Sequence, residues 1–463
     1  MENIAVKKLS KGDWVKWICT IGLPVLVMLI PTNESFNSNI RLFLALTLCA
    51  ILTFAFDNIN QTVVALCLPI LYVVCGLAPA TVAFSPWLQY VPWMTIGGFI
   101  LAAVLDRVGL LKRLACHIIL LTGAKYIGII WGLAISGVIC AITGVGVIPV
   151  FALAYGVCKA LNTGVSKTSA GILLSAAMGV LMASTYLFLG PLIPLGVGMA
   201  VTGPISPLGF LEAFYVNAPS ILGFVIMIFI LGKMTKPKES LDGKEYFKNQ
   251  LVSMGKMTTE EKKSAVVTIL LLLFCITSGK LHHIEVGWGF ILIPALLFLP
   301  GINVGKVEDI KGVNWPFMFF VTACMGIGAV AGALGIGNLI ADTAMPLLQG
   351  KSYYVFFIFE WILIVAGNFI LTPLAMQAAF TVPLVQIAAQ LDINPMAVYY
   401  IMMNACDQII MPYEYALYLI FFSVGLIKMK DFIQILGVKM ILNIVIVFAL
   451  LIPFWKFIGF IFI

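Results

Sequence analysis

The sequence predicts an all-α polytopic membrane protein built from two similar halves. Of its 463 residues, 62% are hydrophobic and only 10% are charged, whereas a soluble domain carries roughly 25% charged residues. Apolar segments follow one another along the whole chain, with one long polar insert between them. Breaks rich in Gly and Pro recur at related positions on both sides of that insert. We therefore expect lipid to cover most of the surface, without a separate soluble domain.

Each predicted span is an apolar segment approaching the roughly 20 residues that a helix needs to cross a bilayer. Together the segments give about eleven full spans and several shorter pieces. In chain order they are Trp17–Ile30, Leu42–Phe56, Val63–Leu77, Trp93–Leu105, a nearly continuous stretch from Ala115 to Leu231, Ala265–Ser278, Val286–Leu299, Trp315–Leu334, Tyr354–Ala366, Phe369–Ala389, Met396–Met411, Tyr415–Ile427 and Phe432–Phe462. No small-residue cleavage site follows the first of them, so we expect a retained span rather than a signal peptide.

The polar insert Lys233–Lys263 divides the chain and predicts its orientation. It carries eight lysines against five acidic residues, and the N-terminus is basic as well. Because Lys and Arg favour the cytoplasmic side, we expect both segments there, with an even number of crossings between them. The predicted organisation is a first membrane half over residues 1–232, a cytoplasmic basic loop over 233–263 and a second membrane half over 264–463. The expected location is a bacterial inner membrane.

The two halves resemble one another in the order of their features. Each has a tryptophan before a Gly-containing apolar helix, which leads into a segment around Gly109, "DRVGLLKRLA", in the first half and around Gly335, "GALGIGNLIA", in the second. Each then has a broken apolar hairpin that ends at a proline, Pro149 or Pro383, and later a second break, at Pro191 or Pro412. Paired, interrupted segments in two halves are typical of the binding site of secondary transporters. If the crossings between the halves differ in parity, the repeat is inverted.

The breaks themselves supply the first candidate binding residues. Non-helical backbone survives at membrane depth only where it is buried or lines a wet cavity, and half-helix N-termini there can bind an anion. The alternative is a set of proline kinks in ordinary packed helices. The candidates for substrate binding are Thr143 and Gly144 in the first hairpin, Thr372 and Pro373 in the second, and Pro191, Pro412 and Tyr413 in the later breaks.

Four segments resemble the divalent anion/sodium symporter family, which carries dicarboxylates, citrate and sulfate. They are "FDNINQTVVALCLPIL" (Phe56–Leu71), "GGFILAAVLDRVGLLKRLA" (Gly97–Ala115), "SKTSAGILLSAAMG" (Ser166–Gly179) and "FFSVGLIKMKDF" (Phe421–Phe432). The resemblance covers most of the chain in order. It implies an inverted repeat with two re-entrant hairpins, a homodimer, and elevator movement of a transport domain.

The chain departs from this family at the hairpin tips. The family has a Ser-Asn-Thr signature there, which binds carboxylate and sodium. The corresponding positions hold Cys140 and Ala141 in the first hairpin and Pro373 and Leu374 in the second, with Asn368 as a nearby amide. The family's Thr-Pro-Pro-Asn loops are also absent. We therefore expect the family's fold and transport, and a changed coupling ion or substrate.

Ionisable residues at membrane depth are functional candidates, because each is expensive to place there. Glu414 follows Pro412 in the last break, and Asp407 lies seven residues earlier, on the same helical face if the helix extends that far. We expect the two carboxylates to bind the coupling ion, either a proton or a neighbouring cation. The alternative for Glu414 is a structural hydrogen bond to a backbone donor. Glu360 is either buried or at a boundary, and Asp106 with Arg107 is expected to form a local ion pair at an interface.

The predicted function is secondary active transport of a small organic or inorganic anion of the di- or tricarboxylate or sulfate class. Coupling to protons is expected more than coupling to sodium, and no other cofactor is expected. Alternatives are a sodium-coupled or exchange-type carrier of another solute, and a passive channel. Scattered cysteines and three histidines in unrelated places predict neither a metal site nor an enzyme. Partners are the lipid bilayer and the solute, with no nucleic acid.

Overall fold

The computed structural model describes residues 11–34, 36–56, 58–142, 147–186, 208, 210–238, 241–277, 281–282, 284, 286–336, 350–369 and 373–462. Regular structure in this part is helical, with two isolated β-bridges and no strand. The predicted all-α class is therefore confirmed.

The helices of the first half follow the predicted apolar segments closely. They are α1 (Lys11–Met28), α2 (Ser38–Phe56), α3 (Gln61–Val74), α4 (Ala80–Ala83), η1 (Ser85–Leu88), α5 (Tyr90–Arg107), α6 (Leu110–Leu121), α7 (Tyr126–Ile142), α8 (Val147–Ala160), α9 (Lys167–Tyr186), α11 (Phe210–Val216) and α12 (Ala218–Met234).

The basic loop contains α13 (Lys244–Met254), and the second half follows it. Its helices are α14 (Thr259–Thr277), α15 (Val286–Ala295), η2 (Leu296–Phe298), α16 (Val307–Lys311), α17 (Trp315–Ala333), α19 (Tyr353–Asn368), α20 (Pro373–Gln390), α21 (Pro395–Cys406), η3 (Pro412–Glu414), α22 (Ala416–Ser423), α23 (Met429–Ile446), η4 (Val447–Leu451) and α24 (Ile452–Phe457). The predicted repeat would pair α7 and α8 with α19 and α20, and α9 with α21. The inverted relation and the domain boundaries stay predictions.

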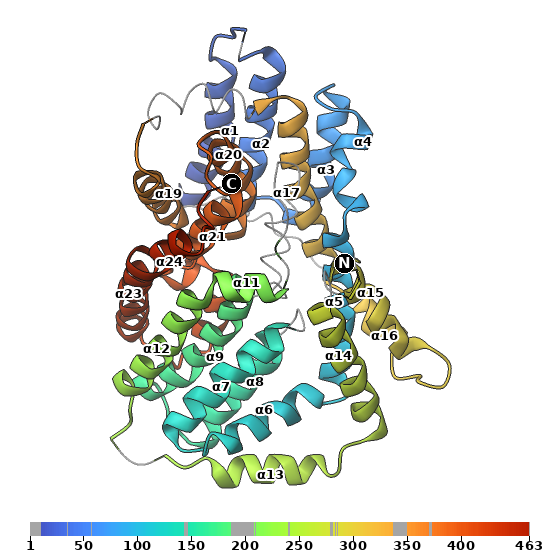
Figure 1. Ribbon diagram of the computed structural model, residues 1–463, viewed down its shortest axis with the longest axis vertical. Coiled ribbons are helices and arrows are strands. Elements are labelled where there is room, and N and C mark those ends of the chain that lie inside the picture. Colours follow the sequence, from blue (N-terminus) through green and yellow to red (C-terminus); the bar gives the residue numbers. More distant parts are fainter. Residues whose placement is uncertain are drawn as a thin grey trace.

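The apolar core forms two main bodies (Figure 1). A smaller bundle consists of α1 to α4 with α17, held by contacts such as the edge-to-face pair Phe54–Phe320 and the Thr47–Tyr72 hydrogen bond of 2.7 Å. A larger bundle consists of α7 to α9, α12 and α19 to α24. Helices α5, α6 and α13 to α16 lie at the side and one end of these bodies, and α13 runs across that end.

Small residues let α7 and α9 approach closely in the larger bundle. A Cβ on Gly137 would lie 2.7 Å from the carbonyl oxygen of Ala176, and one on Gly179 would overlap the backbone of Ala134. Small residues at such crossings are the usual means of packing membrane helices. Helix α9 is consequently buried along nearly its whole length.

Three helices of the described part are long and apolar enough to cross a membrane by themselves. They are α9, α17 and the continuous run from α23 to α24, with a fourth if α5 and α6, bent by 71° at Gly109, count as one. Shorter apolar helices make up the rest. The predicted number of about eleven spans therefore stays a prediction.

Two arginines at the bend between α5 and α6 tie the halves of the chain together. Arg107 bonds both carboxylate oxygens of Asp309 at 2.8 Å and lies 3.8 Å from Glu260. Arg113 bonds both oxygens of Glu261 at 2.7 and 3.2 Å. The expectation of a local ion pair was wrong for Arg107, because the folded chain brings it acidic partners from α14 and α16.

The Asp309 carboxyl lies outside the spans, and its ionisation is favoured. Burial by itself would raise its pKa, but the hydrogen bonds from Arg107 and from the backbone N–H of Lys306 outweigh burial and lower the pKa. The bridge to Arg107 is therefore made by a carboxylate at every pH in the neutral range.

Candidate functional site

The helix breaks predicted from the sequence lie between observed helices. Helix α7 ends at Ile142 and α8 begins at Val147; α19 ends at Asn368 and α20 begins at Pro373; α21 ends at Cys406 before η3. Four predicted site residues lie outside the described residues: Thr143, Gly144, Pro191 and Thr372. The side chains of Leu374 and Tyr413 lie outside the described part as well.

The last turn of α21 has its backbone carbonyls satisfied by side-chain donors. Asn368, at the end of α19, donates from Nδ2 to the carbonyl oxygens of the residues at 405 and 406, at 3.0 and 3.1 Å. Gln408 and Asn443 donate to the carbonyl of Asn404 at 2.8 and 3.2 Å. Lys439 Nζ donates to the carbonyl of Asp407 at 2.8 Å. These four side chains supply the partners that a helix end lacks, so this break can exist inside the protein.

Asp407 forms the C-cap of α21 and is paired with a lysine. Lys439 Nζ lies 2.6 Å from Asp407 Oδ2, and the two side chains are only 14% and 9% exposed. Asp407 Oδ1 is buried and has no partner among the described residues. Because the helix ends at Cys406, the expected shared helical face of Asp407 and Glu414 is wrong. They lie on either side of the break.

Glu414 bonds the backbone on the far side of this break. Its carboxylate oxygens accept hydrogen bonds from the N–H groups of Ile410 and Met411 at 3.2 and 3.0 Å, and the residue is 2% exposed. Glu414 therefore makes the hydrogen bonds to backbone donors that were considered as its structural role. Its role in coupling stays a prediction.

A small central cavity lies where α9, α20 and α21 meet. Its volume is about 10 Å³, room for about one water molecule. It is lined by Leu181, Thr185, Pro373, Gln377, Met403, Cys406, Asp407 and Tyr415. The folded chain thus brings Pro373 and Asp407 together from two separate breaks. Cys140 and Ala141 are buried at the end of α7 and are not among the described residues that line this cavity.

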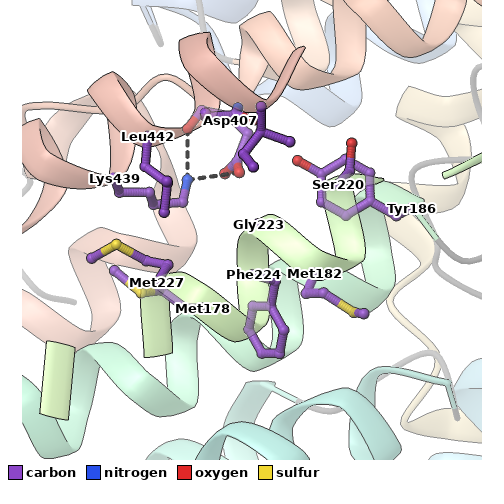
Figure 2. A pocket seen from close by; sticks show the side chains of 12 residues that line it. Met178, Met182, Tyr186, Ser220, Gly223, Phe224, Met227, Asp407, Lys439 and Leu442 are labelled. Carbon is purple, nitrogen blue, oxygen red and sulfur yellow. Dashed lines mark hydrogen bonds and ion pairs between the residues drawn. The ribbon is translucent and has the colours of Figure 1, made fainter. Parts of the chain in front are cut away.

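A second, lateral cavity also has Asp407 in its wall (Figure 2). Its volume is about 40 Å³, enough for two or three water molecules. Asp407 and Lys439 line it together with Ser220 of α12 and Tyr186 of α9, among apolar residues. The Tyr186 hydroxyl donates to Asn404 Oδ1 at 2.9 Å, which joins the ends of α9 and α21. Asp407 therefore borders both cavities.

Two further buried polar side chains have unpaired groups. The amide of Gln377 and the carboxylate of Glu360 are both 0% exposed, and neither has a hydrogen-bond partner among the described residues. Glu360 is consequently interior rather than at a boundary. Unsatisfied buried polar groups are uncommon and are typical of functional positions.

Sequence reasoning missed Lys439, Asn443 and Gln377. A signal for the first two was present, since Lys439 and Asn443 are polar residues one turn apart in the apolar run Phe432–Phe462, and ionisable residues in such runs are functional candidates. Gln377 gave a weaker signal, because an uncharged amide in a helix is common. The described residues contain no group of three His, Cys, Asp or Glu side chains able to hold a metal ion.

Comparison with known proteins identifies relatives over nearly the whole chain. A family model described as "Sodium:sulfate symporter transmembrane region" matches residues 11–461. "Dicarboxylate transporter 1, chloroplastic" of Spinacia oleracea is 22% identical over 350 residues, which are 72% of this chain and 61% of that protein. A "Membrane protein" of Cupriavidus necator is 29% identical over 98 residues, covering 20% of this chain and 19% of its own length.

Two solved structures share the fold at low identity. The YdaH transporter of Alcanivorax borkumensis has a TM-score of 0.56 and 15% identity, covering 97% of this chain and 99% of that one. MtrF of Neisseria gonorrhoeae, described within a class of antimetabolite efflux pumps, has a TM-score of 0.57 and 14% identity, covering 96% and 95%. Both similarities concern the fold alone.

Proposed function

Because the chain belongs to the family of the sodium:sulfate symporter transmembrane region, we propose that it is a secondary transporter that carries a small anion across the membrane. Membership of this family confirms the resemblance noted in the sequence. The chain is a multi-pass membrane protein and not an enzyme, as its family and relatives are transporters.

The observation that carries this proposal is the convergence of two helix breaks on the central cavity. Pro373, at the N-terminus of α20, and Asp407, at the C-terminus of α21, both line it. A helix N-terminus carries partial positive charge and free N–H groups, which favour an anion. The buried, unpaired amide of Gln377 adds N–H donors that an oxyanion would satisfy. With a volume of about 10 Å³ the cavity is too small for such an anion, so substrate binding requires movement that enlarges it.

We propose that the movement is of the elevator type. The larger bundle contains the breaks and the central cavity, and its core extends into α5, α6 and α13 to α15. The smaller bundle has a separate core. Two bodies with separate cores can shift relative to one another without unpacking either, as in other hinge and shear motions. A homodimer and a cytoplasmic N-terminus remain expectations drawn from the family and from the lysine distribution.

The proposed substrates are di- or tricarboxylates or sulfate. The family description names sulfate, and the chloroplast relative is named for dicarboxylates. Each of these anions can accept several N–H bonds at once. Coupling is proposed to depend on pH more than on sodium, because the carbonyls at the end of α21 are already bonded to protein donors. Exchange of one anion for another is the second candidate mode.

Uptake into proteoliposomes tests the proposal. Proteoliposomes that contain the purified protein and are loaded with one anion should accumulate labelled succinate, citrate or sulfate. The variant Gln377→Leu should have a weaker apparent affinity for the substrate, and its melting temperature should be nearly unchanged or raised. Gln390→Leu, at the exposed end of the same helix, is the matched control. Absence of uptake and of anion-induced thermal stabilisation for all three classes would contradict the proposed function.

Glu414→Gln separates coupling from a purely structural role. If Glu414 binds the transported proton, the variant should lose the pH dependence of net uptake and keep exchange. If it serves only as a cap, the variant should lose stability, by about 1–2 kcal/mol for a cap, and retain the pH dependence. An imposed sodium gradient that drives accumulation at fixed pH in both proteins would contradict proton coupling.

A further inference from the structure

The end of α21 has the chemistry of a cation site. A helix C-terminus carries partial negative charge, and half-helix C-termini hold coupling cations in transporters with broken helices. Here the carboxylate of Asp407 adds a full negative charge to the carbonyl of the same residue. Both oxygens converge on one point, which is occupied by Lys439 Nζ at 2.6 Å from Oδ2 and 2.8 Å from the carbonyl oxygen.

Lys439 comes from a position where a lysine is costly. It lies within the long apolar run of α23 to α24 that can span a membrane, and only 14% of its side chain is exposed. An uncompensated charge there is strongly unfavourable, so the pair with Asp407 compensates both charges. The side chain does not lie at a helix end, where it could reach the membrane interface.

The pair borders a cavity that is mostly apolar but contains two unpaired polar groups. The lateral cavity of about 40 Å³ is lined by both members of the pair (Figure 2). Asp407 Oδ1 and Ser220 Oγ are buried and have no partner among the described residues. An ion placed at this point could therefore use the Asp407 carbonyl and carboxylate and one or two cavity waters.

We propose that the Lys439 ammonium group takes the place of a coupling cation, so that the end of α21 carries a built-in positive charge where a sodium ion would otherwise bind. This inference rests on the proposed function only in describing the cation as a coupling ion. It follows that anion transport does not require sodium at this position. Removing the ammonium group should convert the site into one that binds sodium.

Lys439→Met tests this directly, because it keeps most of the side chain, ends one atom short of the ammonium nitrogen and removes the charge. Melting temperature is measured for the full chain in detergent, in sodium chloride against N-methylglucamine chloride of equal concentration. Sodium should raise the melting temperature of Lys439→Met by roughly 2–4 °C at concentrations well above its Kd, with a shift that grows with the logarithm of the sodium concentration, and should not shift wild type. The double variant Lys439→Met with Asp407→Asn should lose the sodium response, because it removes the carboxylate.

Lys167→Met is the matched control, since Lys167 also faces a carboxylate, that of Asp431 at 3.9 Å, but is 52% exposed. It should gain no response to sodium. The inference is overturned if Lys439→Met shows no sodium-specific shift, or if Lys167→Met shows the same shift. If Lys439→Met is unstable, its monodisperse yield should recover when it is purified in sodium, and equal loss in both salts overturns the inference. Wild-type uptake tests the proposed function separately, and its failure leaves this result unaffected.

Discussion

Breaking the Arg113–Glu261 pair should destabilise the protein far more than removing a neighbouring charge. The Arg113 guanidinium makes four hydrogen bonds, two to Glu261 and two to the carbonyls of Met254 and Gly255. Arg113 is 8% exposed and Glu261 only 1%. Replacement by methionine, which fills similar space, leaves the Glu261 carboxylate buried without its cation.

The expected cost follows from that burial. Removing one member of a buried ion pair costs about 3–5 kcal/mol, and each carbonyl left without a donor costs about 1–3 kcal/mol more if water cannot reach it. Gly255 is exposed, so its carbonyl can regain a bond from water. We therefore expect a total of about 4–8 kcal/mol for Arg113→Met. The double variant Arg113→Met with Glu261→Met should recover most of this, because an apolar pair carries no unpaired charge.

A double-mutant cycle measured by thermal or denaturant unfolding in detergent checks the reasoning. Lys112→Met is the matched control, because Lys112 neighbours Arg113 but is exposed, and its expected effect is within about 0.5 kcal/mol. The reasoning is refuted if Arg113→Met costs no more than Lys112→Met. It is equally refuted if the double variant loses the sum of the two single effects, which would mean that the pair contributes no coupling energy.

Three further outcomes follow from the structure. Gly137→Ala should destabilise the protein by about 1–3 kcal/mol, because its Cβ would force α7 and α9 apart. Gly437→Ala is the control: a Cβ there has open space around it, so the variant should be more stable by about 0.5–1 kcal/mol. Unfolding curves check both expectations. Asn368→Ala should cost about 1–3 kcal/mol, since two buried carbonyls at the end of α21 lose their donor; an unchanged melting temperature would show that water replaces the amide. Asp309→Asn should weaken the bridge to Arg107. Because the pKa of folded Asp309 is lowered, the difference in stability between the variant and wild type should be constant above about pH 5 and shrink as the pH falls below about 4. Melting curves measured from pH 3 to 7 check this, and a difference that grows on acidification would contradict it.

Much of the secondary structure could be predicted because span length and apolar composition are local properties. The segment Trp315–Leu334, for example, appears as α17 over Trp315–Ala333. The position of the last break was predicted from Pro412, because proline removes a backbone donor. The residues that make this break tolerable could not be predicted. Asn368, Lys439 and Asn443 are distant in sequence from Asp407, and their hydrogen bonds depend on how the helices pack.

The sequence by itself determined that this chain is a helical membrane protein and that its family is one of anion carriers, whereas the pairing of its breaks stays a prediction. These properties follow from hydrophobicity, from proline and glycine, and from local motifs, each of which acts over at most one helix. The tertiary structure decided which charges meet. Arg107 pairs with Asp309 rather than with its sequence neighbour Asp106. Asp407 pairs with Lys439 and does not share a helical face with Glu414. Electrostatic partners are set by distances of a few ångströms between separate helices, and those distances exist only after the helices have packed.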